Sequence, residues 1–215
     1  MNLKNILLTV VAIAIVTILP HLGLIPFPFG HCIPILLFVW LYLKYHEENF
    51  ADLGFKWKSF SFKSVLIGCL SAILIFTFLQ LIFFPILESF IEFENVDNKL
   101  YDQIRENTGF YIFILIMGWI VGGLYEEIVF HGFIFYRLEK VIPGKYATIL
   151  GFLITSIIFG LYHFQLGSAG VINAFLAGAT YHALVLYHKR NLWYGIFCHA
   201  AFDTIAITFL YLGYL

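Results

Sequence analysis

Charged side chains are scarce in this chain of 215 residues, because Asp, Glu, Lys and Arg together make up only 12% of it. Soluble globular domains carry about 25% charged residues, so this chain lacks the charge to cover a water-exposed surface. A hydrophobic content of 61% is also unlike that of disordered or nucleic-acid-binding proteins. The composition therefore excludes those three classes, predicts no nucleic-acid partner and indicates a polytopic protein surrounded by the lipid bilayer.

Cysteine is rare too, and the 3 cysteines of the chain each lie in an apolar run. An odd, scattered set does not predict a disulfide framework, so small apolar filler within helices is the simpler interpretation. The motifs G-x-S-x-G and H-E-x-x-H are also absent. Their absence disfavours a serine nucleophile and the usual helical zinc-protease motif.

Long apolar runs are abundant, and they predict helices because the runs are continuously apolar rather than alternating. We expect an all-α polytopic membrane protein with about seven transmembrane helices, forming one integral membrane domain over residues 1–215. Six helices are the alternative if the first pair is re-entrant. The predicted helices cover residues 5–24, 31–45, 64–87 and 107–138, two helices within 146–188 that turn near 167–170, and 191–214.

Basic residues are distributed unevenly over this layout. A cytoplasmic N-terminus places ten of the 12 Lys and Arg residues on the inner side. Only Lys99 and Arg105 then lie outside, in a loop rich in acidic residues. We therefore predict an N-in, C-out topology.

Three carboxylates remain inside the predicted spans, and three histidines lie at comparable depth. A charge near the bilayer centre costs roughly 2.5–3.5 kcal/mol even on the lenient insertion scale, so such residues face a bundle interior or a wet cavity. A functional site is the default interpretation for them. They are Glu126, Glu127, His131, His163, His199 and Asp203.

Residues four positions apart share one face of a helix, and three such pairs involve these residues. We expect the three faces, on the fourth, fifth and seventh helices, to form a small polar site between them. Because His199 lies only about eight residues into its helix, the site is expected in the cytoplasmic half of the membrane. The pairs are Glu127 with His131, Phe159 with His163, and His199 with Asp203.

A carboxylate beside an imidazole can activate water, and a second imidazole can stabilise the oxyanion that forms on an amide. This combination favours an intramembrane hydrolase. Four of the residues could instead hold a metal such as Zn²⁺. A proton-coupled transporter and a non-catalytic membrane scaffold are the alternative functions, because buried ionisable residues also mark ion paths and helix contacts.

Three segments resemble the motifs of the CPBP family, the CAAX protease and bacteriocin-processing (Abi) family of intramembrane proteases. Residues 126–132 (EEIVFHG) resemble E-E-x-x-x-R-G, residues 159–163 (FGLYH) match F-x-x-x-H, and residues 199–203 (HAAFD) match H-x-x-x-N/D. The resemblance covers roughly residues 105–210. Three motifs in the family's order, each on a predicted membrane helix, make it fairly specific.

The best-studied branch of this family, the type II CAAX prenyl endopeptidases, removes the last three residues of prenylated proteins. The resemblance implies a peptide or protein substrate, which is lipidated in that branch, and the expected location is a bacterial plasma membrane. It implies no required cofactor, with Zn²⁺ as the alternative. The implied catalytic residues, which are also the ligands if a metal is used, are Glu126 as general base, His163 as its partner on water, and His199 and Asp203 at the oxyanion.

Glu127, His131 and Phe159 are implied as supporting residues, and His131 departs from the family pattern, which has Arg there. A divergent or non-catalytic family member is therefore the alternative.

Two further features have simple interpretations. Gly118 and Gly122, four apart, predict close helix packing, and His182 is expected to be a hydrogen-bonded core residue.

Overall fold

The computed structural model describes residues 3–94 and 99–215, and every regular element within them is a helix. The predicted all-α class is therefore confirmed. Of the described helices, five are long and apolar enough to cross a membrane, and Cys32–Tyr45 and Ala147–Tyr162 are shorter apolar helices. The five long helices and the two shorter ones correspond in order to the seven predicted helices.

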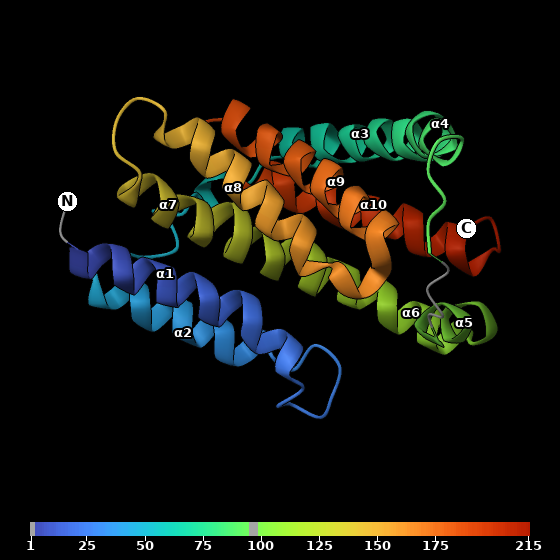
Figure 1. Ribbon diagram of the computed structural model, residues 1–215, viewed down its shortest axis with the longest axis horizontal. Helices are drawn as coiled ribbons and strands as arrows, with labels where there is room; N and C mark the ends of the chain where they lie inside the picture. Colours follow the sequence, from blue (N-terminus) through green and yellow to red (C-terminus); the bar gives the residue numbers. More distant parts are fainter. Residues whose placement is uncertain (1–2, 95–98) are drawn as a thin grey trace.

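The elements are named in chain order (Figure 1). They are α1 (Leu3–Ile18), η1 (Leu19–Leu22), α2 (Cys32–Tyr45), η2 (Trp57–Ser59), α3 (Phe62–Phe78), η3 (Leu79–Phe83), α4 (Phe84–Glu88), α5 (Lys99–Glu106), α6 (Thr108–Met117), η4 (Gly118–Ile134), α7 (Phe135–Val141), α8 (Ala147–Tyr162), η5 (Phe164–Leu166), α9 (Gly167–Tyr187) and α10 (Leu192–Tyr211).

Helix α10 lies at the centre of the bundle and packs most extensively against α3 and η4, with α9 as its third large neighbour. Small residues allow this packing, because Ala72 of α3 and Ala200 of α10 are fully buried. Cys198 of α10 is buried as well, and all three cysteines are unpaired. Their interpretation as apolar filler is consistent with these positions.

The segment η4 is a π-helix of 17 residues that continues α6 into α7. Such widened helices are rare and occur mostly as short bulges at functional sites. Every residue from Tyr125 to Ile134 is buried. The chain thus carries Glu126 and Glu127 through the middle of the bundle on a buried stretch of helix.

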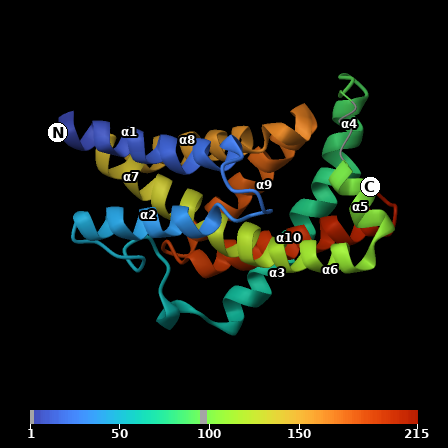
Figure 2. The ribbon, with the colours of Figure 1, turned by 90° about the horizontal axis from the view of Figure 1, so that it is seen from below.

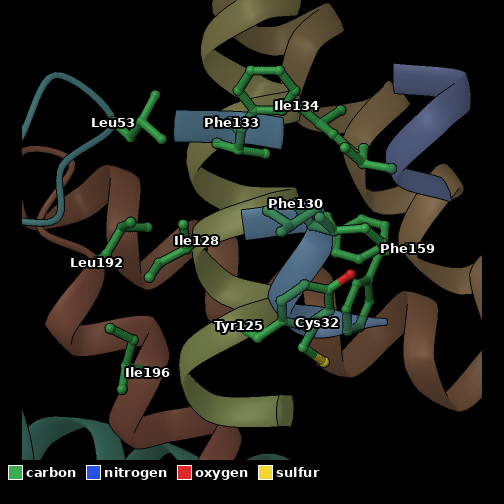
Figure 3. Packing of buried hydrophobic residues seen from close by; sticks show 14 of the residues in the cluster. Cys32, Leu53, Tyr125, Ile128, Phe130, Phe133, Ile134, Phe159, Leu192 and Ile196 are labelled. Atoms are coloured by element: carbon green, nitrogen blue, oxygen red, sulfur yellow. The ribbon is translucent and has the colours of Figure 1, made fainter. Parts of the chain in front are cut away.

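Aromatic and branched side chains surround the part of η4 that follows the two glutamates. Phe130, Phe133 and Ile134 follow one another along it and are 0% exposed (Figure 3). Leu192 of α10 and Leu53 of the loop after α2 belong to the same cluster. This packing closes the bundle between the glutamates and the α7–α8 connection.

The two ends of the bundle differ. The beginning of α1 and the α7–α8 connection lie at one end, whereas α5 and the end of α10 lie at the other (Figures 1 and 2). At the first end, ion pairs tie the connections together: Arg137 to Glu48 at 2.7 Å and Arg190 to Glu139 at 2.7 Å. This end is called the basic end below, and the opposite one the α5 end.

Two local predictions need correction. The turn expected near residues 167–170 lies earlier, because α8 ends at Tyr162 and α9 already begins at Gly167. The His163 side chain bonds back to the carbonyl of Phe159, which favours an end of the helix there. Helix α5 was not predicted at all, since the segment reads as a charged loop, yet its Ile104 is buried against the bundle.

Candidate active site

Glu127 joins two of the three predicted polar faces. Its Oε2 lies 2.9 Å from Nδ1 of His131, and its Oε1 lies 3.1 Å from Nδ1 of His199. The Glu127 side chain is fully buried. Because a carboxylate accepts and a ring N–H donates, both imidazoles present their Nδ1 hydrogens to one carboxylate. The second nitrogen of His199, Nε2, then points away from Glu127.

Glu126 faces the remaining imidazole nitrogens. Its Oε2 lies 3.8 Å from Nε2 of His163 and 3.9 Å from Nε2 of His199. These separations exceed hydrogen-bond length, so the three atoms border a common space. The Glu126 residue is 8% exposed, and that exposure is to a cavity. A small molecule between these atoms would contact one carboxylate and two imidazoles.

The tautomer of His163 follows from its backbone partner. Its Nδ1 lies 2.8 Å from the carbonyl oxygen of Phe159. A carbonyl only accepts, so Nδ1 carries the hydrogen and Nε2 of the neutral ring presents a lone pair toward Glu126. The Phe159 ring also packs edge-on against His163 and His199, with centroids 4.8 and 5.7 Å apart. Phe159 therefore supports both imidazoles.

Asp203 completes the group from one turn further along α10. Its Oδ2 lies 3.7 Å from Nε2 of His199. The structure thus brings Glu126, His163, His199 and Asp203 to one cavity of about 430 Å³. Glu127 and His131 lie directly behind that cavity. The expected convergence of the three faces is observed, and their catalytic roles stay a prediction.

Glycine allows η4 to approach Asp203. A Cβ at Gly122 would lie 2.3 Å from Oδ2 of Asp203 and 3.2 Å from Nε2 of His199. At Gly118, one turn away, the nearest atom would be Cβ of Asp203 at 3.3 Å. The predicted close helix packing at these glycines is confirmed, and Gly122 in particular leaves room for the carboxylate.

Gly122→Ala is therefore expected to displace the Asp203 carboxylate and to lower kcat by about 10²-fold, the usual penalty for a misplacement near 1 Å. Gly118→Ala is the matched control, because its methyl group needs a shift of only a few tenths of an ångström. Rates of peptide cleavage and melting temperatures of both variants check this. Equal rates would show that the position of Asp203 is unimportant.

His131 has a second neighbour behind the site. Its ring stacks on His182 of α9 with centroids 4.7 Å apart, and both residues are at most 1% exposed. Neither ring nitrogen of His182 has a hydrogen-bond partner among the described residues. His182 is therefore buried in the core, as predicted. The prediction that its side chain is hydrogen-bonded is wrong. Rings of Phe135 and Phe152 hold His182 in place.

The four cavity residues are also the ligands named for the alternative in which the protein uses a metal. Tetrahedral zinc with bonds of 2.0–2.1 Å places its ligand atoms about 3.3 Å apart. The facing atoms here are 3.7–3.9 Å apart. Within the described ranges, no group of three or more His, Cys, Asp or Glu side chains is arranged to hold a metal ion. Zinc at this position would therefore require these side chains to move closer together.

Sequence patterns missed several residues of the site. Tyr181 of α9 stacks on His199 with centroids 4.6 Å apart. Gly195 faces Glu127 so closely that a Cβ there would lie 2.3 Å from Oε2. Asn173 of α9 lines the cavity, and its Oδ1 is buried without a partner among the described residues. A tyrosine, a glycine and an asparagine in apolar helices carry no local signal that separates them from packing residues.

The part of the chain that carries this site resembles a known family. Residues 108–205 match the family model described as Rce1-like, type II CAAX prenyl endopeptidase. The match covers a little less than half of the chain and includes η4, α8, α9 and most of α10. The resemblance seen in the three motifs is therefore confirmed. No curated protein and no solved structure matches the chain significantly.

Proposed function

We propose that this chain, whose residues 108–205 match the Rce1-like family model of type II CAAX prenyl endopeptidases, is an intramembrane endopeptidase that hydrolyses a peptide bond with water activated by Glu126 and His163. The observation that carries the proposal is the common space between Oε2 of Glu126 and the Nε2 atoms of His163 and His199. A carboxylate and a lone-pair nitrogen around one space are the groups that general-base activation of water requires.

In the proposed reaction, water lies between Glu126 and His163. The Glu126 carboxylate accepts a proton from the water while its oxygen attacks the carbonyl carbon of the scissile peptide bond. The carbonyl oxygen becomes an oxyanion. Glu126 then returns the proton to the leaving nitrogen as the C–N bond breaks. Glutamate serves as base and then as acid, so no side chain becomes covalently linked to the substrate.

His199 is the proposed donor to the oxyanion. To donate at Nε2 it must carry hydrogens on both nitrogens, a form that Glu127 supports by accepting from Nδ1 at 3.1 Å. Oδ2 of Asp203 lies 3.7 Å from Nε2, beyond hydrogen-bond length, and its negative charge can stabilise the charged imidazole before substrate binds. An ionised Asp203 donates nothing, so its proposed role is to position His199 rather than to bind the oxyanion.

The substrate is a peptide or protein, and a lipidated one fits the family's name. The cavity walls between the site and the α5 end are mostly apolar, formed by residues such as Val121, Met117 and Ile207.

The apolar helices and the membrane-protease family indicate an integral membrane protein. A bacterial plasma membrane remains its proposed location. The proposed depth of the site is the cytoplasmic half, because His199 lies near the beginning of α10.

The proposal is tested by comparing C-termini in membranes that contain either the wild-type chain or Glu126→Gln. New C-termini that appear only with the wild type identify the substrate and the cleaved bond. Identical C-termini in both membranes, despite equal amounts of folded protein, would contradict an endopeptidase function.

We also propose that hydrolysis needs no metal ion, and this is tested separately. Purified protein treated with a strong chelator is expected to keep its cleavage rate, since the cavity residues are spaced too widely for zinc. Cleavage rate and bound metal are measured on the same sample. A rate that is lost with the chelator and restored by Zn²⁺ would show that the four residues close around a metal.

A further inference from the structure

A short stretch around η2 and the beginning of α3 exposes aromatic and basic side chains next to one another. Residues 56–63 read KWKSFSFK and include no acidic residue. Trp57 is 76% exposed, Phe60 51% and Phe62 78%. The exposed basic residues of this stretch, called the 56–63 segment below, are Lys56, Lys58 and Lys63. Large apolar rings on an accessible surface indicate a site of interaction rather than an ordinary solvated turn.

The 56–63 segment is held firmly against the beginning of α10. The indole N–H of Trp193 donates to the carbonyl oxygen of Lys56 at 2.9 Å. The side-chain amide of Asn191 donates to the carbonyl oxygen of Ser59, also at 2.9 Å. The Trp57 ring packs on that of Trp193 with centroids 5.3 Å apart. The exposed rings and charges therefore project from a fixed backbone.

Two helices that can span a membrane begin at this segment. α3 begins at Phe62 and α10 at Leu192, and both helices belong to stretches long and apolar enough to cross a bilayer. The backbone N–H of Leu192 donates to the carbonyl oxygen of Gly54 at 3.3 Å, so the two beginnings are neighbours. The 20 residues of α10 cover about 30 Å, the thickness of the hydrocarbon core. The segment, which projects from the bundle between α2 and α3 (Figure 2), thus lies at the level of the lipid headgroups.

The apolar part of the segment continues into a stripe on α3. Leu66, Leu70 and Leu74 follow Phe62 at intervals of four residues, which places them on the same side of the helix. They are 51%, 51% and 71% exposed. In a helix that crosses the membrane, such side chains contact acyl chains. A lipid whose tails lie along this stripe places its headgroup beside Phe62 and the lysines.

The lysines of the segment are available to an anionic headgroup. Two carboxylates at the basic end already have partners: Glu48 pairs with Arg137 and Lys140, and Glu139 pairs with Arg190. Within the part of the chain that the structure describes, the three lysines of the segment form no ion pair. Their charges are therefore not neutralised by the protein.

We propose that the 56–63 segment and the adjoining stripe of α3 bind anionic phospholipid from the surrounding membrane. The rings of Trp57 and Phe62 lie at the boundary between headgroups and acyl chains, where aromatic residues are enriched in membrane proteins. The three lysines contact the phosphate, and each strengthens binding to an anionic surface by about fivefold. The inference concerns the protein's lipid partner and does not depend on the proposed peptidase function.

Thermal unfolding of the purified full-length protein in a non-ionic detergent tests the proposal. A ligand that binds only the folded state raises the melting temperature as its concentration rises. Three probes are titrated: dioleoylphosphatidylglycerol, the zwitterionic dioleoylphosphatidylcholine with the same chains, and glycerol phosphate, which has the charge without chains. Only the anionic lipid is expected to raise the melting temperature to a plateau.

Replacing Lys56, Lys58 and Lys63 together by Gln is expected to weaken the apparent affinity for phosphatidylglycerol on the order of 10²-fold. Lys58→Gln alone, with an expected loss of about fivefold, replaces the triple variant if that does not fold. The matched control removes three exposed lysines outside the segment and should keep the wild-type affinity. It combines Lys44→Gln, Lys99→Gln and Lys145→Gln.

Phe62→Ser tests the apolar contribution and is expected to weaken binding of the anionic lipid by about tenfold, because a large exposed ring no longer leaves water. Equal losses in the two triple variants would overturn the assignment to this segment. Equal shifts with phosphatidylcholine or with glycerol phosphate would overturn the specificity for an anionic lipid. The absence of any shift with either lipid would overturn the proposal in favour of a protein partner on the exposed rings.

Discussion

Glu126→Gln is expected to reduce the rate of peptide hydrolysis by about 10²–10⁴-fold, the usual contribution of a general base. The amide has almost the same shape as the carboxylate but cannot accept the proton of the attacking water. Among the residues that the structure describes, Glu126 makes no direct hydrogen bond, and its ion-pair contacts are the 3.8 and 3.9 Å approaches of two imidazoles. The bundle should therefore fold normally, and cleavage of a substrate peptide by the purified variant in liposomes measures the effect.

Glu92→Gln is the matched control for this variant. Glu92 is exposed and lies beyond α4, outside the cavity. Its substitution removes the same charge and should leave the rate unchanged. Hydrolysis by Glu126→Gln at the wild-type rate would rule out Glu126 as the base and would favour a transporter or scaffold function for the chain.

Glu127→Gln is expected to have a second large effect, in the range of about 10²–10⁴-fold on kcat. When a carboxylate that holds a catalytic imidazole becomes an amide, the imidazole takes the wrong tautomer, and the loss approaches the upper value in serine proteases. Here Glu127 accepts from His131 and from His199 at once. The single carbonyl oxygen of glutamine can serve only one of them well, and its NH₂ group faces the other.

The measurement for Glu127→Gln separates positioning from folding. A positioning role predicts a low kcat with little change in KM and an altered dependence of kcat on pH. A buried group left without a suitable partner also costs about 1–3 kcal/mol of stability, so a lower melting temperature is expected. Loss of stability together with a normal kcat would show that Glu127 only holds the helices together.

Much of the site could be predicted from sequence because it depends on short-range spacing. The pairs Glu127 with His131 and His199 with Asp203 lie on single helix turns, and in each pair the two side chains do face one another. Scarcity of charge made these residues conspicuous in apolar helices. The convergence of separate helices followed from the cost of leaving such residues in lipid.

Other features depend on contacts between distant segments, and no local pattern carries them. The stack of His131 on His182 joins η4 to α9, and the direct bond from His199 to Glu127 joins residues 72 positions apart. Helix α5 escaped prediction because a short charged segment becomes helical only where Ile104 finds an apolar surface.

The hydrogen bond between η4 and α10 determines when the site can form during synthesis of the protein. Glu127 lies in η4, whereas one of its two imidazole partners lies in α10, which is synthesised later. Until α10 enters the membrane, the nascent chain lacks His199 and Asp203 and the wall they form. In the proposed mechanism, hydrolysis therefore begins only after α10 has packed against η4.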